Sequence, residues 1–288
     1  MLTPTQIIAR KQGIGGSDAA SLLGLNPYCT PYQLWLEKTG QTKQEDIPSN
    51  DPRHIGNVLE AGIAQLFSDM TKLALEEVPQ TLQHPKYPWM LCHLDRKVVT
   101  KNQIVECKNV SERSFKVYQW GEEDSDQIPL HYLVQVQHQL AVTGYSLAYV
   151  AALVGGNRLL RFEINRDEGL INRLIEKEHY FWHEHVLMRK PPDPYNRIDI
   201  SLLYPQDNGD YKEATEEIIY VAKRLHEIKH TKRNLEQEEK NHNDQLALYI
   251  GKNSGIHFAG RPIVTFKATK RGYRVLKTIE RNLYEFSH

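Results

Sequence analysis

Residues 103–109 of the chain, QIVECKN, form a short apolar stretch that carries one acidic and one basic residue. Side chains of residues i and i+2 in a β-strand project to the same face. A strand over this stretch therefore places Glu106 and Lys108 on one face, and Val105 and Cys107 on the other. Taken alone, such a charged pair is usually a solvated ion pair, so its interpretation depends on the residues around it.

A second strand is predicted directly before this one, over residues 90–99, and the polar segment 100–102 joins the two strands as a hairpin. This hairpin brings Asp95 within reach of the face that carries Glu106 and Lys108. Two convergent carboxylates repel each other and are best tolerated around a hard divalent cation such as Mg²⁺. Such a cation polarises a phosphoryl oxygen, and a nearby lysine can orient water or stabilise negative charge. This spacing suits phosphodiester hydrolysis, but on these residues alone a surface ion pair remains an equal alternative.

The composition is that of an ordinary globular protein, with 288 residues, no net formal charge, 40% hydrophobic and 25% charged residues. Cys29, Cys92 and Cys107 are widely spaced, which predicts reduced cytosolic thiols and argues against a disulfide framework. The histidine-rich segment 179–185 allows a zinc site, but histidines on an amphipathic helix more often lie on the surface. No segment approaches about 18 apolar residues, so we expect neither a signal peptide nor a membrane span.

Two domains are predicted, over residues 1–195 and 196–288, because the proline-rich segment 189–197 interrupts the pattern of helices and strands. Beyond it, residues 212–250 predict a charged helical arm with an imperfect heptad repeat, and residues 256–277 predict a β-hairpin.

The C-terminal segment 251–284 is the most basic part of the chain, with a single acid, Glu280. With Phe266 and Tyr273 interleaved, it could bind a nucleic-acid backbone, or it could be an ordinary solvated face. Its basic residues are Lys252, Arg261, Lys267, Lys270, Arg271, Arg274, Lys277 and Arg281.

Five segments of the first domain, in this order, resemble the lambda-type alkaline exonuclease family, or YqaJ-like viral recombinase domain, of the PD-(D/E)XK nuclease superfamily. They are GIGGSDAASLLGLNPYCTPYQLWLEKTG (13–40), GNVLEAGIAQLF (56–67), MLCHLD (90–95), IVECKN (104–109) and YLVQVQHQLAVTGY (132–145). The resemblance implies an α/β (α+β) fold with a restriction-endonuclease-like core, in which helices flank a central mixed sheet. It also implies hydrolysis of DNA with one or two Mg²⁺ ions, for which Mn²⁺ can substitute.

The resemblance assigns metal ligands and a catalytic lysine to the two predicted strands. The ligands would be the carboxylates of Asp95 and Glu106 and the main-chain carbonyl of Cys107. Lys108 would position or activate the attacking water.

Further site residues follow from the same resemblance. Glu60 would be a helical acid near the metal ions, and Gln135 would support the lysine and the substrate. Arg10 and Ser17 would receive the terminal 5′-phosphate, where glycines and a helix N-terminus offer free N–H groups. Without the family, Glu60 would be a surface charge, Gln135 a polar group on an apolar helix, and Ser17 a helix cap. Arg96 departs from the family pattern, because a small residue usually follows the aspartate.

The resemblance thus implies a 5′-to-3′ exonuclease that acts on linear double-stranded DNA in phage-type recombination. It implies a cytoplasmic protein of a bacterial or phage-infected cell, a homo-oligomer, and a single-strand-annealing protein as partner. The alternatives are an endonuclease of the same fold, in defence or mobile-element processing, and a non-catalytic DNA-binding assembly module.

Overall fold

The computed structural model describes residues 11–42, 48, 51–270 and 272–284. It divides into two compact units, Met1–Asp207 and Asn208–His288. A short helix, α8 (Arg197–Leu203), belongs to the first unit, where Thr30 donates a 2.8 Å hydrogen bond to its Asp199. The domain boundary between residues 195 and 196 stays a prediction.

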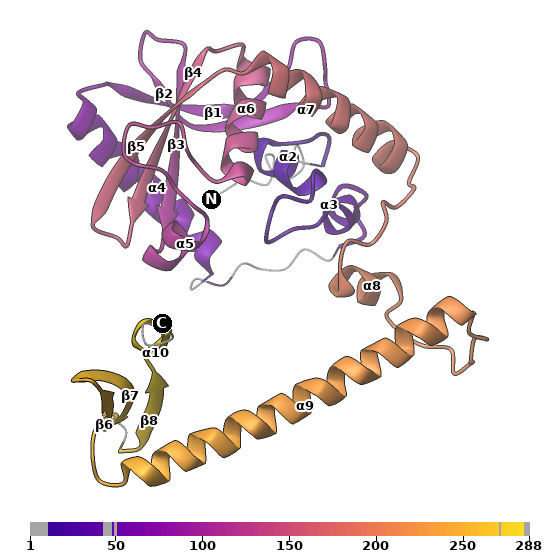
Figure 1. The fold of residues 1–288 in the computed structure, drawn as a ribbon. Helices are drawn as coiled ribbons and strands as arrows, with labels where there is room; N and C mark the ends of the chain where they lie inside the picture. Colours follow the sequence, from indigo (N-terminus) through magenta and orange to yellow (C-terminus); the bar gives the residue numbers. More distant parts are fainter. Residues whose placement is uncertain (1–10, 43–47, 49–50, 271, 285–288) are drawn as a thin grey trace. The chain divides into compact units, whose positions relative to one another are not determined.

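A five-stranded mixed sheet, in the order β1-β2-β3-β4-β5, forms the centre of the first unit (Figure 1). Only β3 and β4 are parallel, and the other neighbours are antiparallel. The predicted hairpin is confirmed as β2 and β3, with Thr100 in the turn at a φ of 61°. The strands are β1 (Leu75–Gln83), β2 (Leu91–Val98), β3 (Gln103–Val110), β4 (Leu147–Val154) and β5 (Arg158–Asn165).

Helices cover both faces of this sheet, as expected for the predicted fold. On one face α4 packs through Ile63 and Phe67 against Val105 of β3. On the other face α6 packs through Leu140 against Ile104. Alternate side chains of β3 therefore pack into two separate apolar layers, one on each face of the sheet. Besides α8, the described helices of this unit are α2 (Gly16–Leu22), α3 (Pro31–Lys38), α4 (Pro52–Thr71), α5 (Glu112–Val117), α6 (Leu130–Thr143) and α7 (Glu168–Tyr180), with a π-helix, η1 (Phe181–Leu187).

A buried ion pair ties α6 to α7 and to the start of β2. His138 donates from Nδ1 to Glu178 Oε1 at 2.7 Å and from Nε2 to the carbonyl of Leu91 at 2.9 Å. Both ionisable side chains are fully buried. Burial alone would lower the pKa of His138, but the charge and hydrogen bond of Glu178 outweigh burial and raise it. The folded protein therefore favours the imidazolium.

We expect Glu178→Gln to destabilise the first unit by about 3–5 kcal/mol near pH 6, because it leaves a buried cation unpaired. The raised pKa of His138 contributes stability in full below about pH 6.5, the ordinary value for histidine. This contribution is lost as the pH rises through the folded-state pKa, so the penalty of the substitution should shrink with rising pH. Urea unfolding followed by tryptophan fluorescence measures this, since all four tryptophans lie in the first unit. A penalty that is independent of pH would contradict the ion pair.

The second unit consists of a long helix followed by a small sheet. The helix is α9 (Glu216–Ile250), and β6 (Gly255–Phe258), β7 (Arg261–Ala268) and β8 (Arg274–Thr278) form the antiparallel sheet, before a short α10 (Glu280–Tyr284). The predicted hairpin within residues 256–277 is present as β6 and β7, and a second turn in the same segment adds a third strand, β8. The first turn uses Gly260, with a φ of 78°, and the second uses Gly272, with a φ of 85°.

The basic sheet of the second unit uses one of its cations for structure. The Arg274 guanidinium lies 4.0 Å from the ring of Phe266 and donates to the carbonyl of Gly251 at 2.5 Å. It thereby joins the sheet to the end of α9. A role of the other basic residues in contacting nucleic acid stays a prediction. Among the described helices, none has the length and apolarity needed to cross a membrane.

Candidate active site

Asp95 lies at an irregularity of β2. Two residue steps along β1, from Glu76 to Val78, span the same distance as three steps along β2, from Lys97 back to Leu94. This extra residue is a β-bulge, which bends a strand and re-aims its side chains. Leu94 packs in the apolar layer under α6, and the bulge leaves the partly exposed Asp95 beside β3.

The Asp95 carboxylate takes the place of a strand-to-strand hydrogen bond. The ladder between β2 and β3 pairs Lys97 with Ile104 and Arg96 with Val105. Further along β3, the N–H of Cys107 donates instead to Asp95 Oδ2, at 2.8 Å. In an extended strand the N–H and C=O of one residue point to the same side. The carbonyl of Cys107 is therefore expected on the β2 side of β3, and its role as a ligand stays a prediction.

Glu106 is almost completely buried, with 3% of its surface exposed, and polar side chains surround its carboxylate. Its Oε1 accepts hydrogen bonds from Lys108 Nζ and from Gln135 Nε2, each at 2.6 Å. Its Oε2 accepts a 2.7 Å hydrogen bond from Gln139 Nε2. Lys108 also donates to Gln135 Oε1 at 3.1 Å. The surface ion pair, the alternative for Glu106 and Lys108, is therefore wrong, because the side chain of Lys108 is only 17% exposed.

Burial and neighbouring charges shift the pKa values of Asp95 and Lys108. Burial raises the pKa of Asp95 well above its usual range, and the negative charges of Glu106 and Glu60 raise it further. Burial alone would lower the pKa of Lys108, but the charges of Glu106 and Asp95 outweigh it and raise the pKa. Lys108 is therefore a cation at neutral pH, and an ionised Asp95 needs an additional positive charge nearby.

Two residues of this cluster were not predicted from the sequence. Gln139 is 2% exposed and holds the second oxygen of Glu106, and its own Oε1 has no hydrogen-bond partner among the described residues. The ring of Tyr132 lies 4.8 Å from Lys108 Nζ, a distance typical of a cation–π contact. Tyr132, Gln135 and Gln139 share one face of α6 at spacings of three and four residues. That spacing in the sequence was the available signal.

Glu60 and Arg96 form an ion pair close to the site. Arg96 donates to Glu60 Oε1 on α4 at 2.8 Å and reaches Glu77 Oε1 at 3.3 Å. It also donates to the carbonyl of Asp95. The unusual arginine after the aspartate therefore links β2 to α4, and the catalytic role of Glu60 stays a prediction.

The glycine-rich segment lies against the helix that carries the two glutamines. A Cβ on Gly16 would meet the Cγ of Gln135 at 3.3 Å and that of Gln139 at 3.4 Å, so glycine permits α2 to pack closely on α6. Ser17 is exposed in the first turn of α2. It is not the helix cap, since Gly15 is the N-cap and donates its N–H to Asp18 Oδ2 at 2.8 Å. Arg10, predicted beside Ser17 for the 5′-phosphate, lies outside the described residues.

The residues around Asp95 fit a hard divalent cation. No described lysine or arginine forms an ion pair with Asp95, whose ionised form is disfavoured by the neighbouring carboxylates. Glu106 Oε2 accepts one hydrogen bond, from Gln139, and an oxygen has room for a second partner. No three Asp, Glu, His or Cys side chains within the described ranges form a metal cluster, including those of segment 179–185. A cation would therefore also need the Cys107 carbonyl and water, and this ligand set stays a prediction.

Comparison with known proteins identifies relatives of the chain. Residues 7–146 match the family model of the YqaJ-like viral recombinase domain. Over 188 residues the chain is 40% identical to the uncharacterized protein YqaJ of Bacillus subtilis (strain 168), covering 65% of this chain. The match spans 57% of that relative's length.

Solved structures share the fold at low sequence identity. An alkaline exonuclease from Laribacter hongkongensis superposes with a TM-score of 0.51 at 18% identity, over 65% of this chain and 97% of its own. A putative exonuclease from Eubacterium rectale gives a TM-score of 0.51 at 12% identity, over 77% of this chain and 98% of its own. The first unit therefore has the PD-(D/E)XK-like fold of these proteins, as predicted.

Proposed function

We propose that the chain is a Mg²⁺-dependent DNA nuclease, and specifically a 5′-to-3′ exonuclease on linear duplex DNA, because residues 7–146 match the model of the YqaJ-like viral recombinase domain. The observation that supports this most is the convergence of Asp95, Glu106 and Lys108 with Gln135 of α6, in a fold shared with alkaline exonucleases.

In this proposal Gln135 and Gln139 hold the carboxylate of Glu106 in one orientation. Gln135 and Gln139 each donate to a different oxygen of Glu106, which removes its freedom to rotate. Asp95 is fixed in the same way by the N–H of Cys107. The two acids are thus held in place before any cation binds, as an efficient metal site requires.

Lys108 acts as a hydrogen-bond donor and a positive charge in this proposal. Two of its three N–H groups point to Glu106 Oε1 and Gln135 Oε1, so the third is available to a water molecule or a phosphate oxygen. Its raised pKa keeps it protonated at neutral pH, which suits orientation of the attacking water and stabilisation of charge on the phosphate. A bound Mg²⁺, or Mn²⁺ in its place, would polarise the phosphoryl oxygen and lower the pKa of a bound water.

The choice of a 5′ end in duplex DNA is supported by the position of the glycine-rich segment. Gly16 lies against Gln135, which brings the start of α2 next to the proposed catalytic cluster. We propose that Ser17 receives the terminal phosphate there, and the predicted role of Arg10, which lies outside the described residues, stays a prediction. The further proposals are a cytoplasmic role in phage-type recombination and transfer of the 3′ strand to a single-strand-annealing protein.

Incubation with Mg²⁺ and three DNA substrates tests the mode of cleavage. The substrates are linear duplex with 5′-phosphate ends, the same duplex with 5′-hydroxyl ends, and closed circular duplex. We expect mononucleotides from the linear substrates, faster from the phosphorylated ends, and an intact circle. Cutting of the circle would replace the exonuclease by an endonuclease, and cleavage of none of the three would favour a non-catalytic binding module.

Gln139→Leu is expected to lower the turnover rate by roughly 10–100-fold, a typical cost of removing a side chain that orients a metal ligand. The substitution frees one oxygen of Glu106 without removing any predicted ligand. Gln137→Leu is the matched control, since Gln137 is equally buried on α6 but bonds to Asn165 and Asp167 on the far side. Equal losses of turnover in the two variants would show that Gln139 acts only through stability.

A further inference from the structure

Helix α9 carries an exposed apolar stripe with the spacing of a coiled coil. The described side chains from Glu216 to His242 are all exposed. Five of them are aliphatic side chains that are at least half-exposed and lie in one stripe along the helix. Successive positions of the stripe alternate between steps of three and four residues, the a and d positions of a heptad repeat. Its apolar members are Ile218, Val221, Leu225, Ile228, Leu235, Leu246 and Tyr249.

We propose that α9 pairs with α9 of a second copy of this chain, as an antiparallel two-stranded coiled coil. The helix extends over 35 residues, which is long enough for five heptads. A polar helix of this length with a single apolar stripe is stabilised in water when that stripe is covered. The charges beside the stripe determine which partner covers it.

Charges at the flanking positions are complementary in the antiparallel arrangement. With the two helices fully overlapped, Lys229 of one copy faces Glu236 of the other, and symmetry makes this pair occur twice. Arg224 faces the uncharged Gln245. No like charges meet at these flanking positions, and such pairs set the orientation of coiled coils.

The parallel arrangement would bring like charges together. Three heptad positions are occupied by Lys232, Glu239 and His242. In a parallel pair each of these would face its own copy inside the seam, and Arg224 would face Lys229. In the antiparallel pair Lys232 lies level with Leu235, and Glu239 with Ile228. Each charged residue can then cover an apolar side chain with its methylene groups while its charge stays in water.

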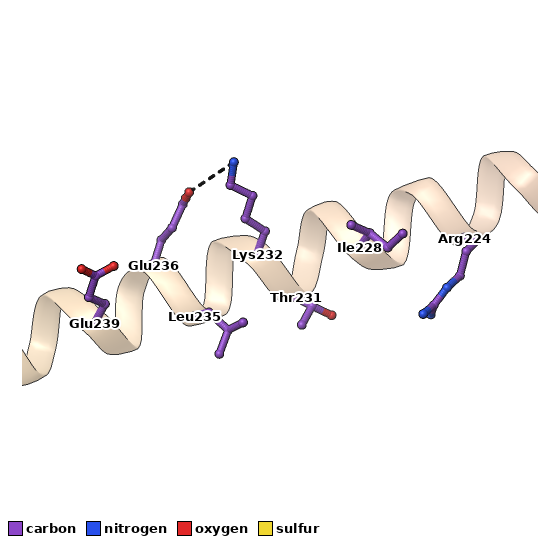
Figure 2. A pocket seen from close by; sticks show the side chains of 7 residues that line it. All are labelled: Arg224, Ile228, Thr231, Lys232, Leu235, Glu236 and Glu239. Atoms are coloured by element: carbon purple, nitrogen blue, oxygen red, sulfur yellow. Dashed lines mark ion pairs between the residues drawn. The ribbon is translucent and has the colours of Figure 1, made fainter. Parts of the chain in front are cut away.

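The surface of the stripe supports this packing. A shallow groove runs along α9 past Ile228 and Leu235. Figure 2 shows Lys232 and Glu236 on one side of the helix, joined by an ion pair of 3.7 Å, with Arg224 and Thr231 pointing to the other side. The groove thus combines the apolar side chains of Ile228 and Leu235 with Lys232 and Glu239 at heptad positions, and its flanking residues are polar.

Sedimentation velocity of the full chain over a range of concentrations tests the proposal. We expect a reversible dimer, and Lys229→Glu should raise its dissociation constant by about tenfold, because two attractive pairs become repulsive. The double variant Lys229→Glu/Glu236→Lys should restore the parent value. Lys223→Glu is the matched control, since it makes the same charge change on the opposite face of α9 and should leave the dissociation constant unchanged.

Three results would overturn the antiparallel dimer. A chain that stays monomeric at every concentration has no such pairing. A Lys229→Glu variant that dimerises more tightly would indicate a parallel pair, because it would then face Arg224. A double variant as weak as Lys229→Glu would show that these two residues do not face each other. None of these outcomes depends on nuclease activity, so the experiment tests the dimer independently of the proposed function.

Discussion

Asp95→Asn is expected to lower the rate of DNA hydrolysis by more than about 10²-fold, since even the loss of a residue that only orients a metal ligand costs 10–100-fold. The substitution keeps the shape of the side chain and removes its negative charge. An amide can still occupy the bulge of β2, and its oxygen can still accept the hydrogen bond from the N–H of Cys107. The loss should therefore appear in Mg²⁺-dependent turnover and not in the folded structure.

Stability of the same variant separates loss of chemistry from loss of fold. Because the folded-state pKa of Asp95 is raised, its ionisation lowers the stability of the metal-free protein as the pH rises above about 4, the ordinary value. Asp95→Asn should remove this effect and be at least as stable as the parent at neutral pH in a chelator. A matched control is Asp124→Asn, whose carboxylate forms an exposed 2.7 Å ion pair with Arg161. Full activity of Asp95→Asn would contradict its assignment as a ligand.

Lys108→Met is expected to lower the turnover rate by about 10²–10³-fold, the usual cost of removing one preorganised donor from a site that stabilises developing charge. Methionine keeps much of the apolar stem but has no ammonium group for Gln135, for water or for a phosphate. We expect turnover to fall without a comparable change in DNA affinity, because the ammonium acts most strongly on the transition state.

The control for Lys108→Met is Lys97→Met, on the neighbouring strand β2. Lys97 forms an ion pair of 3.2 Å with Glu76 at the surface, so its loss should leave turnover unchanged. Lys108→Arg should recover only part of the lost rate, since a planar guanidinium does not fit the geometry of an ammonium between Glu106 and Gln135. A Lys108→Met variant with parental turnover would contradict the proposed role.

The sequence was sufficient to place Glu106 and Lys108 on one face of a strand and Asp95 on the strand before it. These predictions depend only on the two-residue period of a strand and on a short polar turn. The bulge at Asp95 could not be predicted, because an extra residue in one strand is defined only by its pairing with another, here β1.

Long-range packing accounts for the other differences. The contact of Gly16 with Gln135 and the buried pair of His138 and Glu178 join segments that are far apart in the chain. The sequence could have indicated Gln139, which lies one helical turn after Gln135. Only the structure shows that both glutamines donate hydrogen bonds to Glu106. The extra turn in the C-terminal sheet was missed because two short turns in one basic segment were interpreted as one.

The central claim is that Asp95, Glu106 and Lys108 form a metal-dependent nuclease site. Its most direct test is the release of nucleotides from a linear duplex with 5′-phosphate ends, for the parent and for Asp95→Asn, with Mg²⁺ and with a chelator. We predict release by the parent only when Mg²⁺ is present, and almost none by the variant. A parent that releases no nucleotides with Mg²⁺ or Mn²⁺, or a variant that equals the parent, would contradict the account.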